Sequence, residues 1–281
     1  MKALIVTADD FGLAPEVNEG VERAHTRGIL TAASLMVAGA AAADAVVRAR
    51  RLPTLRVGLH LVLVDGPPLL PPERIPHLVD GDGQLRSDLA MTGIGIALRR
   101  GARAELAAEI EAQFVAFEAT GLPLDHVNAH HHFHLHPTVA ALIVDIGRRV
   151  GMRGIRVPIE SADLLARIDR SHRGRSALAM APWAALLRRR VRRRGLSVPD
   201  RVFGLAWSGA MTEQRILGVL ANLADGVTEI YCHPASADRF AGAARGYRYA
   251  DEVAALTAPA VRDALLASGA RSGGFSDVAP R

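Results

Sequence analysis

Residues 3–12 read Ala-Leu-Ile-Val-Thr-Ala-Asp-Asp-Phe-Gly. The first part of this stretch is a short continuous apolar run, which is typical of a parallel strand buried on both faces. Asp9 and Asp10 follow at once, so the sequence predicts two carboxylates at the C-terminal end of this strand. Barrels of parallel strands carry their active sites at that end. The stretch therefore indicates an α/β fold and a candidate site together.

Strands and helices alternate along the rest of the chain. Apolar runs predict the strands, and helical periodicity with Pro, Thr or Gly near its ends predicts the helices. The alternation implies a parallel sheet, most simply a distorted (β/α) barrel of the TIM type. Strands are expected at 3–7, 31–37, 56–63, from 125, 154–158, 202–207, 227–232 and 269–277, and helices at 15–25, 40–51, 102–119, 137–150, 212–223 (capped by Thr212) and from about 250 and 259.

The length of the chain favours one domain. A chain of 281 residues suits one barrel better than two small domains. No internal repeat or interdomain linker is visible, so we expect a single domain over residues 1–281. Residues 161–200 break the alternation with a long Arg-rich segment, which we interpret as a helical insertion. Residues 65–88 are rich in Pro, Gly and Asp and predict a long surface loop.

Histidines are concentrated in residues 125–137, which read Asp-His-Val-Asn-Ala-His-His-His-Phe-His-Leu-His-Pro and hold six of the 11 histidines. Neutral imidazole is the commonest protein ligand of transition metals. In an extended chain His130, His132 and His134 would share a side, whereas in a helical turn His130 and His134 would share a face. The cluster is internal and interrupted by apolar residues, unlike an expression tag. We expect a metal or catalytic role for at least one of these histidines.

Two further histidines lie at predicted strand ends. His60 is the lone polar residue inside the strand at 56–63, and His233 follows the strand at 227–232. Alone, His60 would be more typical of a hydrogen-bonded core histidine, and Asp9 and Asp10 could equally cap a helix or form a turn. Together, acids and imidazoles from four strands predict one functional rim.

The residue types at this rim suit hydrolysis. One carboxylate and two imidazoles make a three-ligand metal site that leaves coordination positions open. A second carboxylate can take a proton from water, and an imidazole across the site can give one to a leaving group. Asp9, Asp10 and His233 supply these parts. Such a ligand set suits Zn²⁺ and also accepts Mg²⁺, so the identity of the one divalent ion stays open.

Composition excludes several other classes. Lys2 is the only lysine, so Schiff-base chemistry and a phosphate-binding Gly-Lys loop lack their essential residue. The net charge is +5, and the six arginines within 188–194 account for more than all of it. The positive charge is therefore local, and nucleic-acid binding over the whole surface is not expected. Cys232 is the only cysteine, and we expect a small buried residue rather than a nucleophile. With no disulfide and no visible export signal, the sequence predicts a cytoplasmic protein.

Four motifs carry a resemblance to a known family. They are Thr-Ala-Asp-Asp-Phe-Gly at 7–12, Val-Gly-Leu-His-Leu at 57–61, the run at 125–137, and Cys-His-Pro-Ala at 232–235. In this order they resemble the YdjC-like carbohydrate deacetylases, also called the ChbG/HpnK family, over nearly the whole chain. The Ala-Pro-Glu-Val-Asn-Glu segment and the Leu-Val-Leu-Val-Asp-Gly segment after His60 are more similar to the hopanoid-biosynthesis branch than to the chitooligosaccharide branch.

The resemblance implies a distorted barrel, a homodimer and a divalent ion held by Asp10, His60 and His130. It also implies that Asp9 is the base and His233 the acid. Family members often carry Asp two residues before the first histidine of the triple-histidine run, where this chain has Asn128. That departure leaves the support of the metal ligand in question.

The substrate implied is an N-acetylated amino sugar. The resemblance to the hopanoid branch implies removal of the acetyl group from a hopanoid glycolipid of the acetylglucosaminyl bacteriohopanetetrol type. We place Arg156 and His132 in substrate binding, although Arg156 could equally pair with a carboxylate. The alternatives are a chitooligosaccharide deacetylase, a metal-dependent phosphoesterase, and a non-catalytic carbohydrate binder.

An apolar stripe in the Arg-rich segment predicts a membrane contact. Trp183, Leu186, Leu187 and Val191 fall on one helical face, among the six arginines. Apolar side chains flanked by cations are typical of interfacial helices. The simpler alternative is a helix that packs this stripe on the barrel. With a lipid-linked substrate in mind, we expect residues 183–194 to dock the protein on the inner face of the cytoplasmic membrane.

Overall fold

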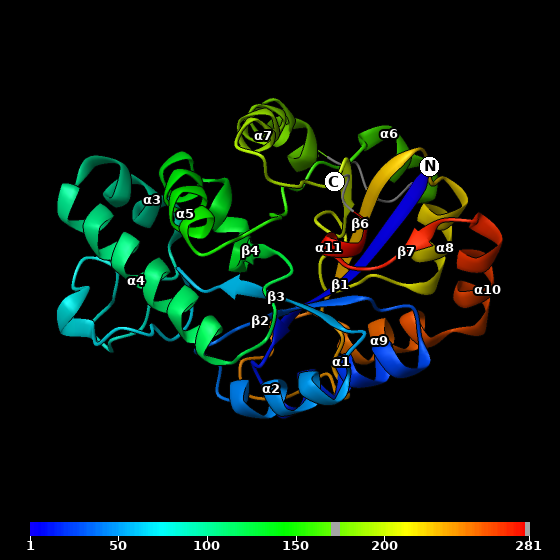
Figure 1. Ribbon diagram of the computed structural model, residues 1–281, viewed down its shortest axis with the longest axis horizontal. Coiled ribbons are helices and arrows are strands. Elements are labelled where there is room, and N and C mark those ends of the chain that lie inside the picture. Colours follow the sequence, from blue (N-terminus) through cyan, green and yellow to red (C-terminus); the bar gives the residue numbers. More distant parts are fainter. Residues whose placement is uncertain (170–174, 279–281) are drawn as a thin grey trace.

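A parallel sheet forms the centre of the computed structural model, which describes residues 1–169 and 175–278 (Figure 1). Its strands run in the order β4-β3-β2-β1-β6-β5, with β7 beside β1. The N-terminal strand β1 therefore lies in the middle of the sheet. The strands are β1 Lys2–Phe11, β2 Ala32–Leu35, β3 Arg56–Leu61, β4 Val127–Ala129, β5 Arg201–Phe203, β6 Gly226–Cys232 and β7 Arg271–Ser272.

Helices cover the sheet in groups that follow the chain. α1 packs on α2 and α9, α4 packs on α3 and α5, and α8 packs on α10. Figure 1 shows the α3–α4–α5 group at one end of the molecule and α8 and α10 at the other. The helices are α1 Pro15–Arg27, α2 Ala42–Arg51, α3 Leu89–Leu98, α4 Arg100–Ala119, α5 Pro137–Arg149, α6 Ala162–Ile168, α7 Arg175–Arg193, α8 Glu213–Ala221, α9 Tyr249–Thr257, α10 Pro259–Ser268 and α11 Phe275–Val278, with the 3₁₀ turns η1 Pro72–Arg74 and η2 His130–Leu135.

The segment after α5 links the two edges of the sheet. Ile155 pairs with Val127 of β4 and donates its N–H to Ser197, at 3.0 Å. Farther along, the N–H of Val202 in β5 donates to Ile159, at 3.0 Å. The predicted regular strand at 154–158 is wrong, because these contacts are isolated and Pro158 has no N–H to continue a ladder. The single-domain α/β architecture, a distorted TIM-like barrel, is confirmed.

Other expectations were met in part. The predicted final strand at 269–277 is only the short β7, followed by α11. Thr212 stands at the N-cap of α8, but its side chain makes no capping hydrogen bond there. The segment at 161–200 contains α6 and α7, while its residues 170–174 lie outside the described part of the chain. That it is an insertion stays a prediction.

The apolar stripe of α7 faces inward. Leu187 and Val191 are buried, and the Trp183 indole N–H donates to the backbone oxygen of Leu135, at 2.6 Å. Only Leu186 of the four residues is exposed, at 40%. The expectation that this stripe faces a membrane is therefore wrong for Leu187 and Val191, because both pack in the core. Among the described residues, no helix is long and apolar enough to cross a membrane.

Candidate functional site

A bulge in β1 brings both carboxylates to one side. Ala8 pairs with Ala33 of β2, but the next pair is Phe11 with Leu35, so β1 carries one extra residue. Within it Asp10 adopts φ 63°, in the left-handed region that Asp tolerates better than most residues. Adjacent residues of a regular strand point to opposite faces. A bulge re-aims one of them, and here both carboxylates line the same cavity.

The cavity has a volume of about 730 Å³ and lies at the C-terminal ends of the central strands. Six of the predicted site residues line it, from the strands β1 and β3, the turn η2 and the loop after β6. Arg156 is the one predicted site residue that is absent from the lining. The six are Asp9, Asp10, His60, His130, His132 and His233.

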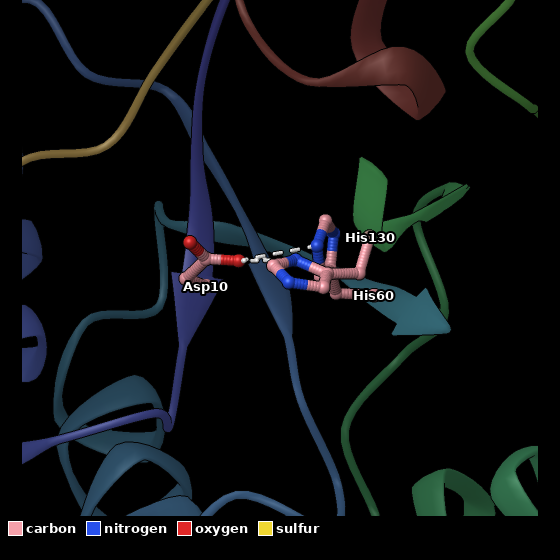
Figure 2. A group of neighbouring side chains, drawn as sticks. All are labelled: Asp10, His60 and His130. Carbon is pink, nitrogen blue, oxygen red and sulfur yellow. Dashed lines mark ion pairs between the residues drawn. The ribbon is translucent and has the colours of Figure 1, made fainter. Parts of the chain in front are cut away.

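Asp10, His60 and His130 converge on one point in this cavity (Figure 2). Asp10 Oδ1 lies 3.2 Å from His60 Nε2 and 3.3 Å from His130 Nδ1. Asp10 Oδ1 and His60 Nε2 are both buried without a hydrogen-bond partner among the described residues. Ligand atoms that share an ion at about 2.0–2.1 Å lie roughly 3 Å apart, so these three residues fit a divalent cation.

Asn128 contacts the ring nitrogen of His60 that faces away from Asp10. Asn128 Oδ1 accepts a hydrogen bond from His60 Nδ1 at 2.8 Å, and both side chains are buried. Because Nδ1 carries the proton, the Nε2 lone pair faces Asp10. Ligating histidines commonly have such an oxygen partner. The amide oxygen of Asn128 therefore contacts His60 Nδ1, where the oxygen of an Asp would have been expected.

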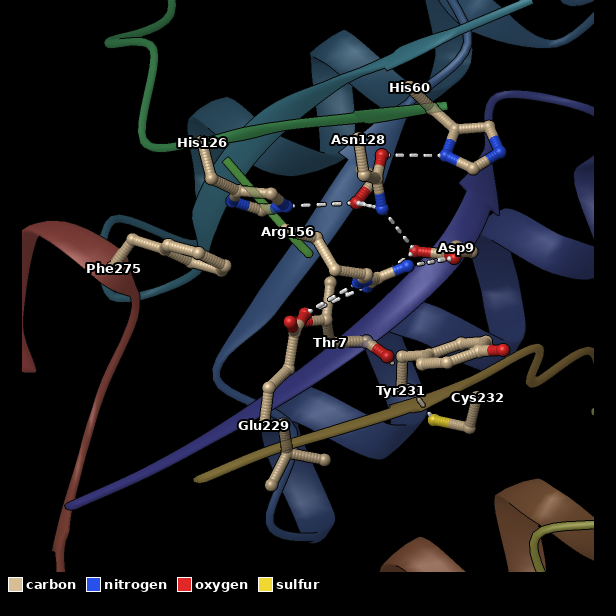
Figure 3. Close-up of polar contacts among 12 residues, drawn as sticks. Thr7, Asp9, His60, His126, Asn128, Arg156, Glu229, Tyr231, Cys232 and Phe275 are labelled. Atoms are coloured by element: carbon tan, nitrogen blue, oxygen red, sulfur yellow. Dashed lines mark hydrogen bonds and ion pairs between the residues drawn. The ribbon is translucent and has the colours of Figure 1, made fainter. Parts of the chain in front are cut away.

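Asp9 is held by Arg156 (Figure 3). The guanidinium donates to both carboxylate oxygens, at 2.5 and 3.0 Å, and its other edge donates to Glu229, at 2.8 and 3.0 Å. Burial alone would raise the pKa of Asp9, but Arg156, His60 and His233 together hold it well below its ordinary value. Asp9 is therefore ionised.

Arg156 does not reach a substrate. Its side chain has no exposed surface, lies over the Tyr231 ring at 4.4 Å, and is shared between Asp9 and Glu229. The assignment of Arg156 to substrate binding is wrong, and the alternative of pairing with a carboxylate is confirmed. A lone arginine near a rim does not reveal in sequence how deeply it is buried.

The triple-histidine run has neither of the expected geometries. His131 and His132 both adopt left-handed conformations, with φ of 52° and 53°. The chain therefore turns sharply after β4, so that His130, His131 and His132 all line the cavity while His134 is fully buried. The sequence carries no clear signal for this turn, because positive φ is uncommon for any residue other than glycine, although histidine adopts it more often than most.

His132 is a neutral residue of the cavity wall. Its Nε2 lies 2.7 Å from the hydroxyl of Tyr231. Burial, and then the nearby His134 and Arg156, hold the pKa of His132 well below its ordinary value. A neutral imidazole with a hydroxyl partner suits contact with sugar hydroxyls, so the placement of His132 in substrate binding stays a prediction.

His233 is fixed by a residue that the sequence did not reveal. Its backbone N–H donates to the buried carboxylate of Glu252, which also accepts from the N–H of Met211 at 2.8 Å. Burial raises the pKa of Glu252. The His233 ring lies 5.1 Å from that of Tyr247, which also lines the cavity. Glu252 lies in the predicted C-terminal helix, 19 residues from His233, and no local motif links the two.

Cys232 is not a nucleophile of this cavity. Its side chain is 1% exposed, its Sγ lies 3.4 Å from the backbone oxygen of Thr7, and it does not line the cavity. Burial raises the pKa of Cys232 well above its ordinary value, which disfavours the reactive thiolate. The structure thus confirms a buried structural cysteine.

An apolar groove adjoins the cavity. It has a volume of about 530 Å³ and shares His131, His132 and Leu205 with the cavity lining. Most of its other walls are apolar. They are Leu89, Phe133, Leu135, Pro137 and Trp183, together with His136.

Known proteins are similar to this chain in sequence. The chain is 32% identical over 259 residues to a carbohydrate deacetylase of Geobacillus stearothermophilus, covering 91% of this chain and 89% of the relative. It is 31% identical over 292 residues to a chitooligosaccharide deacetylase of Yersinia pestis, covering 98% and 99% of the two chains.

A solved structure is similar to this chain in fold. An Enterococcus faecalis V583 protein, described as a cellobiose-phosphate cleavage protein, superposes with a TM-score of 0.75 at 26% identity and 99% coverage of both chains. The family model described as YdjC-like protein matches residues 3–267. With its carboxylates and imidazoles gathered at one cavity, the chain belongs to the YdjC-like family.

Proposed function

We propose that this protein is a metal-dependent N-deacetylase that hydrolyses the acetamide of an N-acetylglucosamine-type sugar. One observation carries the proposal. Asp10 Oδ1 and His60 Nε2, two buried ligand atoms with no hydrogen-bond partner among the described residues, lie beside the separately ionised carboxylate of Asp9 in one cavity. The relatives named as carbohydrate and chitooligosaccharide deacetylases support the same chemistry.

The roles of the residues follow from their contacts. A divalent ion at Asp10, His60 and His130 would polarise the acetamide carbonyl and make water more acidic. Asp9 Oδ1 already accepts from Arg156 and Asn128, whereas Oδ2 accepts only from Arg156 among the described residues, so Oδ2 has room to take the proton of the attacking water. His233 gives a proton to the sugar nitrogen as the C–N bond breaks. The products are acetate and a free amino sugar.

The phosphoesterase alternative loses its main support in the structure. Phosphate esters are usually bound by cationic groups that converge on the phosphoryl oxygens. Arg156, the cation expected at the rim, is buried and compensated by Asp9 and Glu229. Acetate release from an N-acetylglucosaminide, assayed beside phosphate release from p-nitrophenyl phosphate, separates the two activities. Release of phosphate without acetate would overturn the proposal, and release of neither would favour a carbohydrate binder.

We further propose that the sugar is carried on an apolar tail, as in a hopanoid glycolipid of the acetylglucosaminyl bacteriohopanetetrol type. The groove that continues from the cavity supports this, because Phe133, Leu135 and Trp183 offer apolar surface to a tail. A lipid tail would cover more of this apolar surface than the hydroxyl-rich edges of an oligosaccharide would. The alternative, a chitooligosaccharide deacetylase, keeps its support from the Yersinia relative.

The two substrates can be compared directly. An alkyl N-acetylglucosaminide should show a higher kcat/KM than di-N-acetylchitobiose, and Phe133→Ala should lower only the value for the alkyl substrate. Leu266→Ala, at a side chain that is 79% exposed on α10, is the control for truncation of an apolar side chain far from the groove, and the free energy of unfolding of Phe133→Ala, whose ring is 5% exposed, is measured beside it. Equal losses on both substrates in Phe133→Ala, or a preference for the disaccharide, would favour the oligosaccharide enzyme.

We also propose a peripheral contact between the arginines of 188–194 and anionic lipid on the inner face of the cytoplasmic membrane. Arg189, Arg190 and Arg193 are exposed, and none of the three forms an ion pair with an acidic residue in the described part of the chain. Changing these three to Gln should reduce sedimentation with anionic liposomes at low salt, because each cation adds about 1 kcal/mol near such a surface. The exposed Arg99, Arg100 and Arg103, changed to Gln together, are the control. Equal sedimentation of the two variants would overturn this contact.

The resemblance also predicts a homodimer, for which light scattering on the eluting protein is the test. A mass of 29.9 kDa, that of one chain, at micromolar concentration would contradict it.

A further inference from the structure

Asn128 lies where the metal ligands and the base meet (Figure 3). Its side chain is fully buried and makes three contacts. Oδ1 is 2.8 Å from His60 Nδ1, and Nδ2 is 2.8 Å from Asp9 Oδ1 and 3.0 Å from Ser34 Oγ. One primary amide therefore contacts both a ligand of the proposed metal site and the proposed base.

The orientation of this amide is fixed by chemistry. A carboxylate accepts hydrogen bonds and donates none, so the group that faces ionised Asp9 must be the NH₂ of Asn128. The oxygen then faces His60, and His60 must carry its proton on Nδ1. A flipped amide would set an oxygen against Asp9 and an N–H against His60, losing at least one hydrogen bond.

A second layer holds the amide. Ser34 Oγ accepts from Asn128, so its own proton points to His126 Nε2, at 2.9 Å. His126 Nδ1 then donates to Asp125 Oδ2, at 3.0 Å. All members of this chain are buried. The donor and the acceptor of every hydrogen bond from Asp125 through His126, Ser34 and Asn128 to Asp9 are thus defined.

Asp125 ties this layer to the C-terminal segment. It accepts from the backbone N–H of Phe275 at 3.0 Å and from the N–H and hydroxyl of Ser276 at 2.9 and 2.6 Å. The Phe275 ring stacks on His126, with centroids 4.6 Å apart. The His126 ring is therefore held by hydrogen bonds at both nitrogens and by stacking on one of its faces.

We propose that Asn128 is a positioning residue with two separable tasks. Its oxygen sets the Nδ1-protonated tautomer of His60, which leaves Nε2 free for a cation, and its NH₂ fixes the rotamer of Asp9. The chain Ser34–His126–Asp125 sets the orientation of the amide for both tasks. The second task rests on the proposed function, whereas the first concerns His60 and the cation alone.

Two substitutions separate the tasks. Asn128→Asp keeps an oxygen for His60 but has no N–H for Asp9, whereas Asn128→Ala removes both partners. In the metal-free protein, ¹⁵N NMR of the labelled imidazoles should show His60 in one tautomer in the wild type and Asn128→Asp, and in a mixture in Asn128→Ala. His60→Gln assigns the signal. Asn18→Ala removes another buried amide with three hydrogen bonds and is the control for loss of packing, with the His60 tautomer unchanged.

The metal affinity and the turnover rate of the same variants are measured next. Asn128→Ala should raise the Kd for Zn²⁺, measured by chelator competition, by roughly 10- to 100-fold, which is typical for loss of a group that supports a ligand. Asn128→Asp should keep the wild-type Kd but lower kcat by about 10-fold or more, with little change in KM. An unchanged tautomer and Kd in Asn128→Ala would overturn the first task. Wild-type kcat in Asn128→Asp, with acetate released normally, would overturn the second.

Discussion

The Asp9 carboxylate and the Arg156 guanidinium meet through two parallel hydrogen bonds of 2.5 and 3.0 Å, and neither side chain is more than 3% exposed. Glu229 holds the opposite edge of the same guanidinium. One cation is therefore shared by two buried carboxylates. Paired buried charges of this kind depend strongly on each member, because the loss of one leaves the others uncompensated.

Removing the guanidinium should destabilise the fold. Arg156→Met leaves Asp9 and Glu229 as neighbouring unpaired carboxylates, so we expect a loss of roughly 3–5 kcal/mol in the free energy of unfolding, measured in urea. Arg149→Met is the matched control, because its pair with Glu111 is more than half exposed and should contribute about 1 kcal/mol at most. Similar losses in both variants would show that the burial of Arg156 is not decisive.

Loss of one imidazole should reduce metal binding. His60→Ala and His130→Ala each remove one of three protein ligands, and each should lower metal content, measured by mass spectrometry of the dialysed protein, together with acetate release. Chelation of the wild type should abolish activity, and added metal should restore it. His77→Ala, at an exposed histidine paired with Glu105, should bind metal normally. Full metal content in His60→Ala and His130→Ala would point to His131 or His132 instead.

The two adjacent aspartates should respond differently to the same change. Asp9→Asn should keep the metal but lower kcat by about 10²- to 10⁴-fold, the usual contribution of a positioned base. Asp10→Asn should lose metal, because a neutral amide is a weaker ligand than a carboxylate. His233→Ala should keep metal and lose rate. Near-normal turnover in Asp9→Asn would remove Asp9 from proton transfer.

Glu160 should make stability depend on pH. Burial raises its pKa from the ordinary value of 4.5 to about 7, even though it accepts from the N–H groups of Gly204, Leu205 and Ala206. A raised folded-state pKa means that the folded state prefers the neutral form. The contribution of Glu160 to the free energy of unfolding is fully present below about pH 4.5 and is lost as pH rises through 7, by roughly 3 kcal/mol in total.

The measurement compares unfolding free energies of the wild type and Glu160→Gln between pH 5 and 8. The wild type should lose stability relative to the variant as pH rises. A flat difference would show that the three N–H donors outweigh burial.

Local sequence patterns were sufficient to predict the central strands and most of the predicted site residues that line the cavity. The apolar run before Asp9 and the one before His233 each predicted a strand that the structure contains, because a strand buried on both faces needs little beyond local hydrophobicity. The same runs placed their polar ends at one edge of the sheet. Helix α3 was not predicted, since it is apolar all round and interrupted by Gly93 and Gly95, and so lacks a helical stripe.

Long-range features could not be predicted in this way. The burial of Arg156 depends on Glu229, 73 residues later, and the support of His233 depends on Glu252 in a helix. His131 and His132 adopt positive φ one after the other, which is uncommon for non-glycine residues, and the surrounding structure holds them there. Periodicity records neither partners in distant segments nor backbone conformations that tertiary contacts enforce.

The central place of β1 has a consequence for the order in which the protein is made. Thr7 in β1 pairs with Tyr231 of β6 and bonds to Glu229, 222 residues farther along the chain. A ribosome therefore releases the strand that carries Asp9 and Asp10 long before the neighbour that completes its ladder. Until β6 emerges, one edge of β1 has no native partner and its apolar side chains stay exposed. A nascent chain of this protein should be a client of holding chaperones, and its site can form only late in synthesis.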